Sequence, residues 1–207
     1  MAEAREIFPI KTVEGYFDFV SPFSYLQMFR FGELPDDVEI AFYPVLFAEL
    51  LGRWGHKGPA EIPAKRIFTM RHVAWLAGHD AIPCKLPLAF PFNPIRALRL
   101  CLALGSRRDT VETIFRCVWQ DVLLPDKDAG WCAIADAEVK ASLISNGGRA
   151  QELGIYGAPT FDAGGELFWG ADATDFLLDF LCSPGLPKQE EFSCFAAAPS
   201  SAPMRSA

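Results

Sequence analysis

The sequence lacks the features that mark several large classes of protein. Its 207 residues carry a net charge of −7 and no cluster of five or more Lys and Arg residues, so we expect neither a nucleic-acid nor a membrane partner. No window of eighteen apolar residues occurs, and the first fifteen residues include acids but no continuous apolar stretch of signal-peptide length. We therefore expect a soluble cytoplasmic protein.

The cysteines and histidines lack the spacing of a metal or redox site. The six cysteines include no C-x-x-C pair, which argues against a zinc site, a dithiol motif or a compact disulfide framework, and favours reduced cysteines that serve packing. His72 and His79 have only Asp80 beside them as a third ligand, so no metal site is expected. Ser21 is not surrounded by a G-x-S-x-G motif and has no histidine nearby in the sequence, so it lacks the features of a hydrolase nucleophile.

What is present begins with a strand, a helix and a second strand. Residues 12–20 are rich in aromatic and branched side chains, residues 22–31 have apolar residues at helical spacing, and residues 38–45 alternate as a strand does. About half of the residues are hydrophobic, enough for one sizeable core, and a single domain with elaborations is the default.

A helical block of about eighty residues follows, with amphipathic segments over 63–77, 94–104 and 109–124. The first of these places one apolar stripe on its surface, formed by Ile67, Met70, Val73, Ala74 and Ala77. Shorter helical pieces are predicted over 136–144 and 148–153.

The last elements are a hairpin over 159–169 with a Gly164-Gly165 turn and a closing helix over 173–181. The order β-α-β, helices, β-β-α predicts an α/β protein with a thioredoxin-like core split by an all-helical insertion. The expected core is 12–45 with 150–182, the insertion is 46–149, and 183–207, rich in Ser, Ala and Pro, is expected to be a flexible tail.

Ser21-Pro22 stands where the first strand gives way to the first helix. Serine is a good N-cap and proline suits the first helical position, so a plain cap is one interpretation. The other uses the same geometry, because a helix N-terminus stabilises a thiolate or carboxylate and Ser21 could donate a hydrogen bond to it.

A proline at the start of a core strand cannot donate to the sheet ladder, so Pro159 needs another reason to be there. A cis Ala158–Pro159 bond would present the Ala158 backbone to a ligand, whereas an ordinary loop proline is the alternative.

Four stretches occur in an order that resembles one family, the 2-hydroxychromene-2-carboxylate isomerases, which belong with the kappa-class glutathione transferases in the thioredoxin-like superfamily. They are S-P-F-S-Y from Ser21, W-G-H-K-G-P-A (Trp54 to Ala60), P-F-N-P (Pro91 to Pro94) and G-x-x-G-A-P-T-F followed by F-W-G-A-D (Gly154 to Asp172). The resemblance extends from about Thr12 to Leu181.

The resemblance implies glutathione as the cofactor. Ser21-Pro22-Phe23-Ser24 replaces the C-P-x-C of the wider superfamily, so the sulfur would come from glutathione and lie beside Ser21. Ala158, before a cis Pro159, would pair with the glutathione backbone. The segment Trp169, Gly170, Ala171 and Asp172 would hold its γ-glutamyl end, with Asp172 as a plain helix N-cap the alternative.

The substrate residues are less well marked. The family's substrates carry an aromatic ring and a carboxylate, and we expect His56 and Lys57 to supply a basic group, with solvated surface the alternative for Lys57. A gapless alignment places Leu51 where the family has its substrate-binding lysine. Asn93 is expected either to cap a helix or to line the substrate pocket.

The leading hypothesis is an isomerase of an aromatic carboxylic acid, in which the Ser21 hydroxyl and the helix N-terminus lower the pKa of the glutathione thiol and the thiolate adds reversibly to the substrate. One alternative is a kappa-like glutathione transferase or peroxidase that consumes the thiol. Another is a non-catalytic ligand-binding module on the same scaffold. The resemblance also implies a homodimer.

Overall fold

A four-stranded mixed sheet forms the centre of the fold. The computed structural model describes residues 12–131, 136–183 and 186–196. Strands β1 (Thr12–Phe17), β2 (Glu39–Pro44), β3 (Thr160–Ala163) and β4 (Glu166–Trp169) lie in the order β2-β1-β3-β4. β1 pairs in parallel with β2 and antiparallel with β3, which pairs antiparallel with β4. Strands far apart in the sequence therefore form one sheet.

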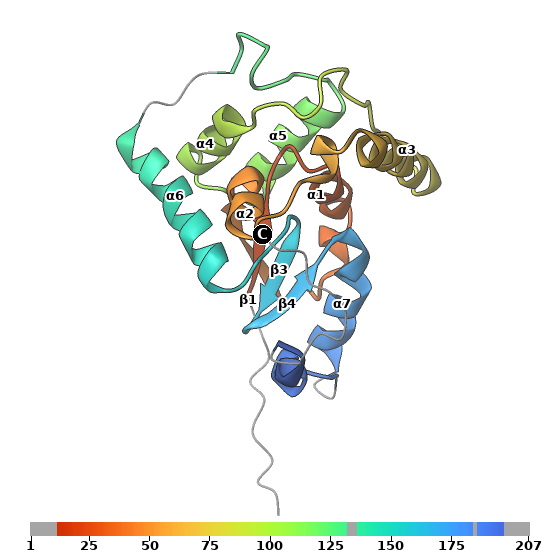
Figure 1. The fold of residues 1–207 in the computed structure, drawn as a ribbon, viewed down its shortest axis with the longest axis vertical. Helices are drawn as coiled ribbons and strands as arrows, with labels where there is room; N and C mark the ends of the chain where they lie inside the picture. The colour runs from red at the N-terminus through yellow and green to blue at the C-terminus, as the bar shows by residue number, and fades with distance from the viewer. Residues whose placement is uncertain (1–11, 132–135, 184–185, 197–207) are drawn as a thin grey trace, which may run out of the picture.

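Helices pack around this sheet, with α6 (Ala137–Glu152) to its left and α7 (Thr174–Cys182) to its right in Figure 1. The other α-helices are α1 (Pro22–Met28), α2 (Phe47–Arg53), α3 (Pro63–His79), α4 (Ile95–Ala103) and α5 (Arg108–Trp119). Short 3-10 helices are η1 (Phe31–Glu33), η2 (Pro59–Glu61), η3 (Ala171–Ala173) and η4 (Gln189–Ala196). The β-α-β opening, the helical middle and the β-β-α close are as predicted.

Three predicted elements end early for local reasons. β1 stops at Phe17 because the chain turns at Asp18, whose carbonyl accepts the Ser21 N–H at 3.0 Å. α1 stops at Met28, after which Arg30 N bonds to the carbonyl of residue 27, a tighter 3-10 contact. α5 stops at Trp119 because Val122 has a φ of 60°, which a right-handed helix does not allow.

Helix α6 is continuous, so the prediction of two separate pieces over 136–144 and 148–153 was wrong. The pair Gly147-Gly148 lowers local helix propensity, which is why the sequence suggests a break. Packing outweighs that cost. Leu143, Gly147 and Ala150 form a buried face, and the Asn146 amide donates to the Pro44 carbonyl of β2 at 3.0 Å.

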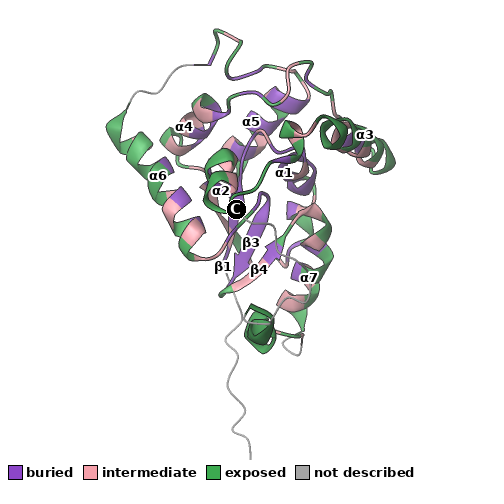
Figure 2. Ribbon diagram, in the orientation of Figure 1, coloured by how far each residue is buried: buried purple, intermediate pink, exposed green. Residues whose placement is uncertain are grey.

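The predicted apolar stripe of α3 is only partly buried. Val73 and Ala77 are buried, but Ala74 is exposed and Ile67 is 63% exposed. The helix touches the rest of the protein along a narrow face, and Figure 2 shows most of its surface as exposed. Periodicity identified the helix correctly but overestimated the width of its buried face.

The core has one large cluster and one small one. The large cluster joins the sheet to the helical region through side chains such as Phe17, Phe19, Phe115 and Trp119. The small cluster lies beside α2 and consists of Tyr16, Val45, Leu50, Ala150 and Ile155. Among the helices that the structure describes, none combines the length and apolar character needed to cross a membrane.

Candidate functional site

Ser21 lies at the turn between β1 and α1, where it is the N-cap of the helix. Its backbone is extended (φ −81°, ψ 113°), its Oγ accepts the Ser24 N–H at 3.2 Å, and Pro22 takes the first helical position. The same Oγ donates to the Ala158 carbonyl at 3.0 Å, across 137 residues of sequence. The side chain therefore caps the helix and also joins it to the segment before β3.

The segment before β3 carries a cis peptide bond between Ala158 and Pro159. Both residues are buried, and the Pro159 carbonyl accepts the Gly170 N–H at 2.9 Å. The Gln27 amide of α1 donates in turn to the Gly170 carbonyl at 3.4 Å. These contacts gather three predicted stretches, at Ser21, Ala158-Pro159 and Gly170, around the start of α1.

The stretch from Trp169 to Asp172 leaves β4 and enters η3. The Trp169 side chain is 52% exposed, and its ring packs edge to face against Tyr156 with centroids 4.9 Å apart. Asp172 is exposed within η3, while the N-cap position of α7 is Ala173. The alternative that Asp172 is a plain N-cap of the last helix was therefore wrong.

A fully buried carboxyl group lies under the Ser21 turn. Asp18 Oδ1 accepts the Val20 N–H at 3.1 Å, and Oδ2 accepts the Phe47 N–H, at the start of α2, at 2.9 Å. Burial raises the pKa of this carboxyl to about 7, and the N–H groups of Phe47, Val20 and Phe19 oppose that rise. Asp18 is thus a titratable group close to Ser21.

The predicted substrate residues His56 and Lys57 lie in an exposed turn after α2. The residue that positions this turn is Trp54, whose indole N–H donates to the Ile155 carbonyl at 3.0 Å. Ile155 precedes Ala158 by three residues, so the turn begins close to the segment that Ser21 contacts. A role for His56 and Lys57 with substrate stays a prediction.

Asn93 lies two residues before α4, whose N-cap position is Pro94. Its Oδ1 accepts the Ile95 N–H, the first N–H of the helix, at 3.0 Å. The neighbouring Phe92 packs against Trp119, with ring centroids 6.4 Å apart, and the Trp119 indole N–H donates to the Phe19 carbonyl at 3.0 Å. The segment of Asn93 is thereby linked to the β1–α1 turn, and its contact with substrate stays a prediction.

Sequence reasoning missed Asp18, the hydrogen-bonding role of Trp54, and Tyr156. The signal for Asp18 was a single acid inside an apolar run, which requires buried partners when the run is a core strand. Trp54 and Tyr156 stood within stretches that carried the family resemblance, but their contacts depend on Ile155 and Trp169, which no local pattern reveals.

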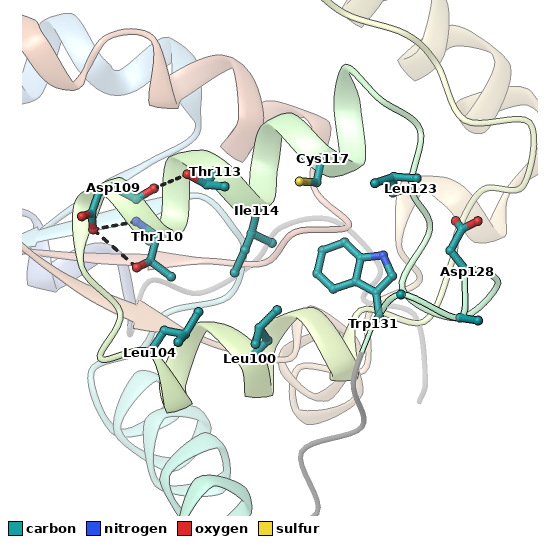
Figure 3. A pocket seen from close by; sticks show the side chains of 12 residues that line it. Leu100, Leu104, Asp109, Thr110, Thr113, Ile114, Cys117, Leu123, Asp128 and Trp131 are labelled. Atoms are coloured by element: carbon teal, nitrogen blue, oxygen red, sulfur yellow. Dashed lines mark hydrogen bonds between the residues drawn. The ribbon is translucent and has the colours of Figure 1, made fainter.

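A separate cavity of about 640 Å³ lies in the helical region, between α4, α5 and the segment 123–131 (Figure 3). Leu100 of α4 and Leu104, which follows that helix, face Ile114 of α5 across it, with the Trp131 ring at one end. Cys117 also lines the cavity, and burial raises the pKa of its thiol. None of the predicted site residues is among its lining residues.

Metal and disulfide chemistry receive no geometric support in the part of the chain that the structure describes. No group of three or more His, Cys, Asp and Glu side chains there is placed to hold a metal ion. Five cysteines are free in the described ranges, and Cys132 lies outside them.

The chain matches a known protein family and several curated proteins over most of its length. A family described as "DSBA-like thioredoxin domain" matches residues 12–182. A curated 2-hydroxychromene-2-carboxylate isomerase from Sphingobium xenophagum is 28% identical over 83% of this chain and 98% of that protein. A second such isomerase, from Pseudomonas sp. (strain C18), is 28% identical over 79% of this chain and 86% of that protein. Glutathione S-transferase kappa 1 from Caenorhabditis elegans is 23% identical over 83% of this chain and 91% of that protein.

Solved structures agree on the fold. A structure of 2-hydroxychromene-2-carboxylate isomerase superposes with a TM-score of 0.70 at 23% identity, over 84% of this chain and 97% of that one. These comparisons confirm the predicted thioredoxin-like fold and the family resemblance.

Proposed function

Because the chain belongs to the DSBA-like thioredoxin domain family, we propose that it is a glutathione-dependent isomerase of a small aromatic carboxylic acid. The curated relatives bear out the enzyme class that the sequence predicted, an isomerase. Their name suggests a substrate like 2-hydroxychromene-2-carboxylate. The observation that carries the proposal is the 3.0 Å hydrogen bond from Ser21 Oγ to the Ala158 carbonyl.

The described residues fit glutathione. Ser21 and Ala158, which the resemblance assigns to the thiol and to the peptide backbone of glutathione, touch each other. Gly170 is joined to Pro159, so Trp169, Gly170, Ala171 and Asp172 lie on the same side of the fold as this pair. When bound, glutathione supplies a thiolate that adds reversibly to an electrophilic carbon, permits rotation about the resulting single bond, and leaves again.

Ser21 would act as a hydrogen-bond donor. Ser21 is 5% exposed, and its hydroxyl has one proton, whose hydrogen bond the Ala158 carbonyl accepts. If the Ser21 hydroxyl instead donates its hydrogen bond to the glutathione sulfur, the thiolate is stabilised and the pKa of the thiol falls. The N-terminal turn of α1 adds to this effect. The Ala158 carbonyl would then accept a peptide N–H of glutathione instead.

The remaining residues would bind and orient. The exposed Asp172 carboxylate suits the γ-glutamyl amine, with Trp169 beside it as an apolar wall. Lys57 and His56, in the turn that Trp54 ties to Ile155, would attract the substrate carboxylate, and Asn93 would line the substrate pocket.

The test is turnover of 2-hydroxychromene-2-carboxylate by Ser21→Ala at saturating glutathione. Loss of one positioned donor to a developing charge lowers kcat by roughly a hundredfold. Ser24→Ala is the matched control, since Ser24 is a buried serine in the same turn whose Oγ has no partner among the described residues. Undiminished turnover by folded Ser21→Ala, checked by circular dichroism, would sink the assignment.

A kappa-like glutathione transferase is the alternative with support of its own, from the Caenorhabditis elegans relative. The two activities differ in the fate of the thiol. Free thiol measured during turnover stays constant for an isomerase, whereas conjugation of a test electrophile consumes it. Calorimetry that finds no glutathione binding at millimolar concentration would instead favour a non-catalytic module.

The homodimer and the cytoplasmic location stay predictions that accompany this proposal. Sedimentation equilibrium of the purified chain tests the first, and fractionation of the source cells tests the second.

A further inference from the structure

Helix α2 lacks a local cap and takes one from Asp18 instead. Its N-cap residue, Leu46, makes no side-chain cap bond within the described structure, and Asp18 Oδ2 accepts the N–H of Phe47 from 29 residues away. The other oxygen, Oδ1, accepts the Val20 N–H. One carboxylate therefore holds the start of α2 against the turn that ends in Ser21.

The far end of α2 is tied to the same site from the other side. Trp54, which follows the helix, donates its indole N–H to the Ile155 carbonyl. Leu50, in the middle of α2, is fully buried in the small core cluster with Ile155. Helix α2 thus spans from the Ser21 turn to the segment that leads into Ala158.

These contacts close a ring. It runs from Asp18 along the chain to Ser21, from Ser21 Oγ to the Ala158 carbonyl, back along the chain to Ile155, and from Ile155 to Trp54. The axis of α2 then returns to Phe47 and Asp18. Any loosening of one contact allows the Ser21 hydroxyl, the Ala158 carbonyl and the turn bearing His56 and Lys57 to shift against one another.

The two oxygens of the ionised Asp18 side chain match the two N–H groups at this position. Each of its two oxygens accepts one N–H, and both N–H groups belong to the backbone, which fixes their directions. An asparagine has the same shape but only one accepting oxygen, so its NH2 group would face one of the two donors. A serine or alanine would leave at least one N–H unpaired.

We propose that Asp18 is a positioning residue of the site, which sets the spacing of Ser21, Ala158 and the substrate-side turn through the ring that α2 closes. Asp18 touches none of the reacting atoms and acts through Val20, Phe47 and Trp54. The kinetic part of this proposal rests on the proposed isomerase function, whereas the ring itself can be tested without activity.

The first test compares Asp18→Asn with Asp162→Asn. Asp162 is also a buried carboxyl with a backbone partner, the Gly165 N–H at 2.7 Å, but it lies in the β3–β4 hairpin, off the ring. Loss of one hydrogen bond to a charged group is expected to lower kcat/KM of Asp18→Asn roughly tenfold, and Asp162→Asn should match the wild type. Equal kcat/KM for Asp18→Asn and wild type would overturn the proposal.

A double-mutant cycle adds Trp54→Phe, which removes the indole N–H but keeps an aromatic ring on a 44% exposed residue. Trp54→Phe also tests the proposal by itself if Asp18→Asn does not fold. This single variant is expected to lower kcat/KM several-fold. If both residues act through α2, the double variant loses less than the product of the single losses. A loss equal to that product would mean that the two contacts are independent, and would refute the ring.

The readout that needs no activity is exchange of the Trp54 indole proton in protein labelled with ¹⁵N-tryptophan, with the Trp54→Phe spectrum assigning the signal. Asp18→Asn is expected to accelerate this exchange severalfold, while Asp162→Asn leaves it unchanged. Unchanged exchange in Asp18→Asn contradicts the ring. Accelerated exchange in a protein with no isomerase turnover would leave the ring standing and reject only the proposed function.

Discussion

The buried carboxyl of Asp18 connects folding to protonation. Its pKa of about 7 lies well above that of an aspartate in an unfolded chain, so the folded state holds its proton more tightly. Between about pH 4 and pH 7 the folded protein then binds more protons than the unfolded one, and the free energy of unfolding falls as pH rises. This contribution to stability is complete below about pH 4 and is lost as pH rises through about 7.

We expect the difference in unfolding free energy between wild type and Asp18→Asn to change with pH in that window. Relative to the variant, the wild type should lose a few kcal/mol from pH 4 to pH 7.5, since each pKa unit corresponds to about 1.4 kcal/mol. Urea unfolding at a series of pH values measures this. A constant difference across the window would show that Asp18 titrates normally.

What the sequence could predict at single positions depended on the range of the interaction. The N-cap role of Ser21 follows from its neighbours, and the structure shows it, because the Ser24 N–H is three residues away. The N–H donors to Asp18 are partly remote, since the Phe47 N–H reaches its carboxyl group only after β2 has paired with β1. The geometry around Ala158 required the resemblance, because no local rule brings it to Ser21.

Helix α6 shows how tertiary contacts decide a local ambiguity. The two glycines at its centre predicted a break, yet the helix passes through them because its buried face and Asn146 are held by β2 and α2. Strand β2 and helix α4 were predicted within one residue at each end. The width of the buried face was predicted less well, since α3 exposes residues that its periodicity placed in the core.

Replacing Gly148 by alanine should stabilise α6. A Cβ at this position meets nothing within 4 Å, and alanine is favoured in helices by about 0.5–1 kcal/mol, so Tm should rise by roughly 1–4 °C. Gly147→Ala is the matched control, since its Cβ would lie 3.3 Å from Glu49 Oε2 and should gain less. Calorimetry measures both, and a lower Tm for Gly148→Ala would contradict the expectation.

The sheet and the helical region share one core. Phe19, in the β1–α1 turn, packs against Phe115 of α5 at 4.7 Å between ring centroids, and its carbonyl accepts the Trp119 indole N–H. Arg149 of α6 also donates to Tyr16 of β1, at 2.9 Å. Two sequence segments that look like separate domains are therefore joined by buried aromatic contacts and by a part-buried hydrogen bond.

We expect the two parts to unfold in one transition. Far-ultraviolet circular dichroism, dominated by the helices, and tryptophan fluorescence should give the same urea midpoint. Trp119→Phe, which removes the bond to Phe19 from a fully buried residue, should lower both midpoints together. Two separated transitions would show that the helical region is an independent unit.

Under the proposed function, the hydrogen bond between Ser21 and Ala158 has a consequence for which thiols the protein would accept. The hydroxyl and the carbonyl satisfy each other at 3.0 Å, so an incoming sulfur that takes the hydroxyl must also provide for the carbonyl. A thiol attached to a peptide brings an N–H that can donate to the Ala158 carbonyl. A small alkyl thiol has no such N–H and would leave this buried oxygen without a hydrogen bond. The proposed site would therefore discriminate against small alkyl thiols.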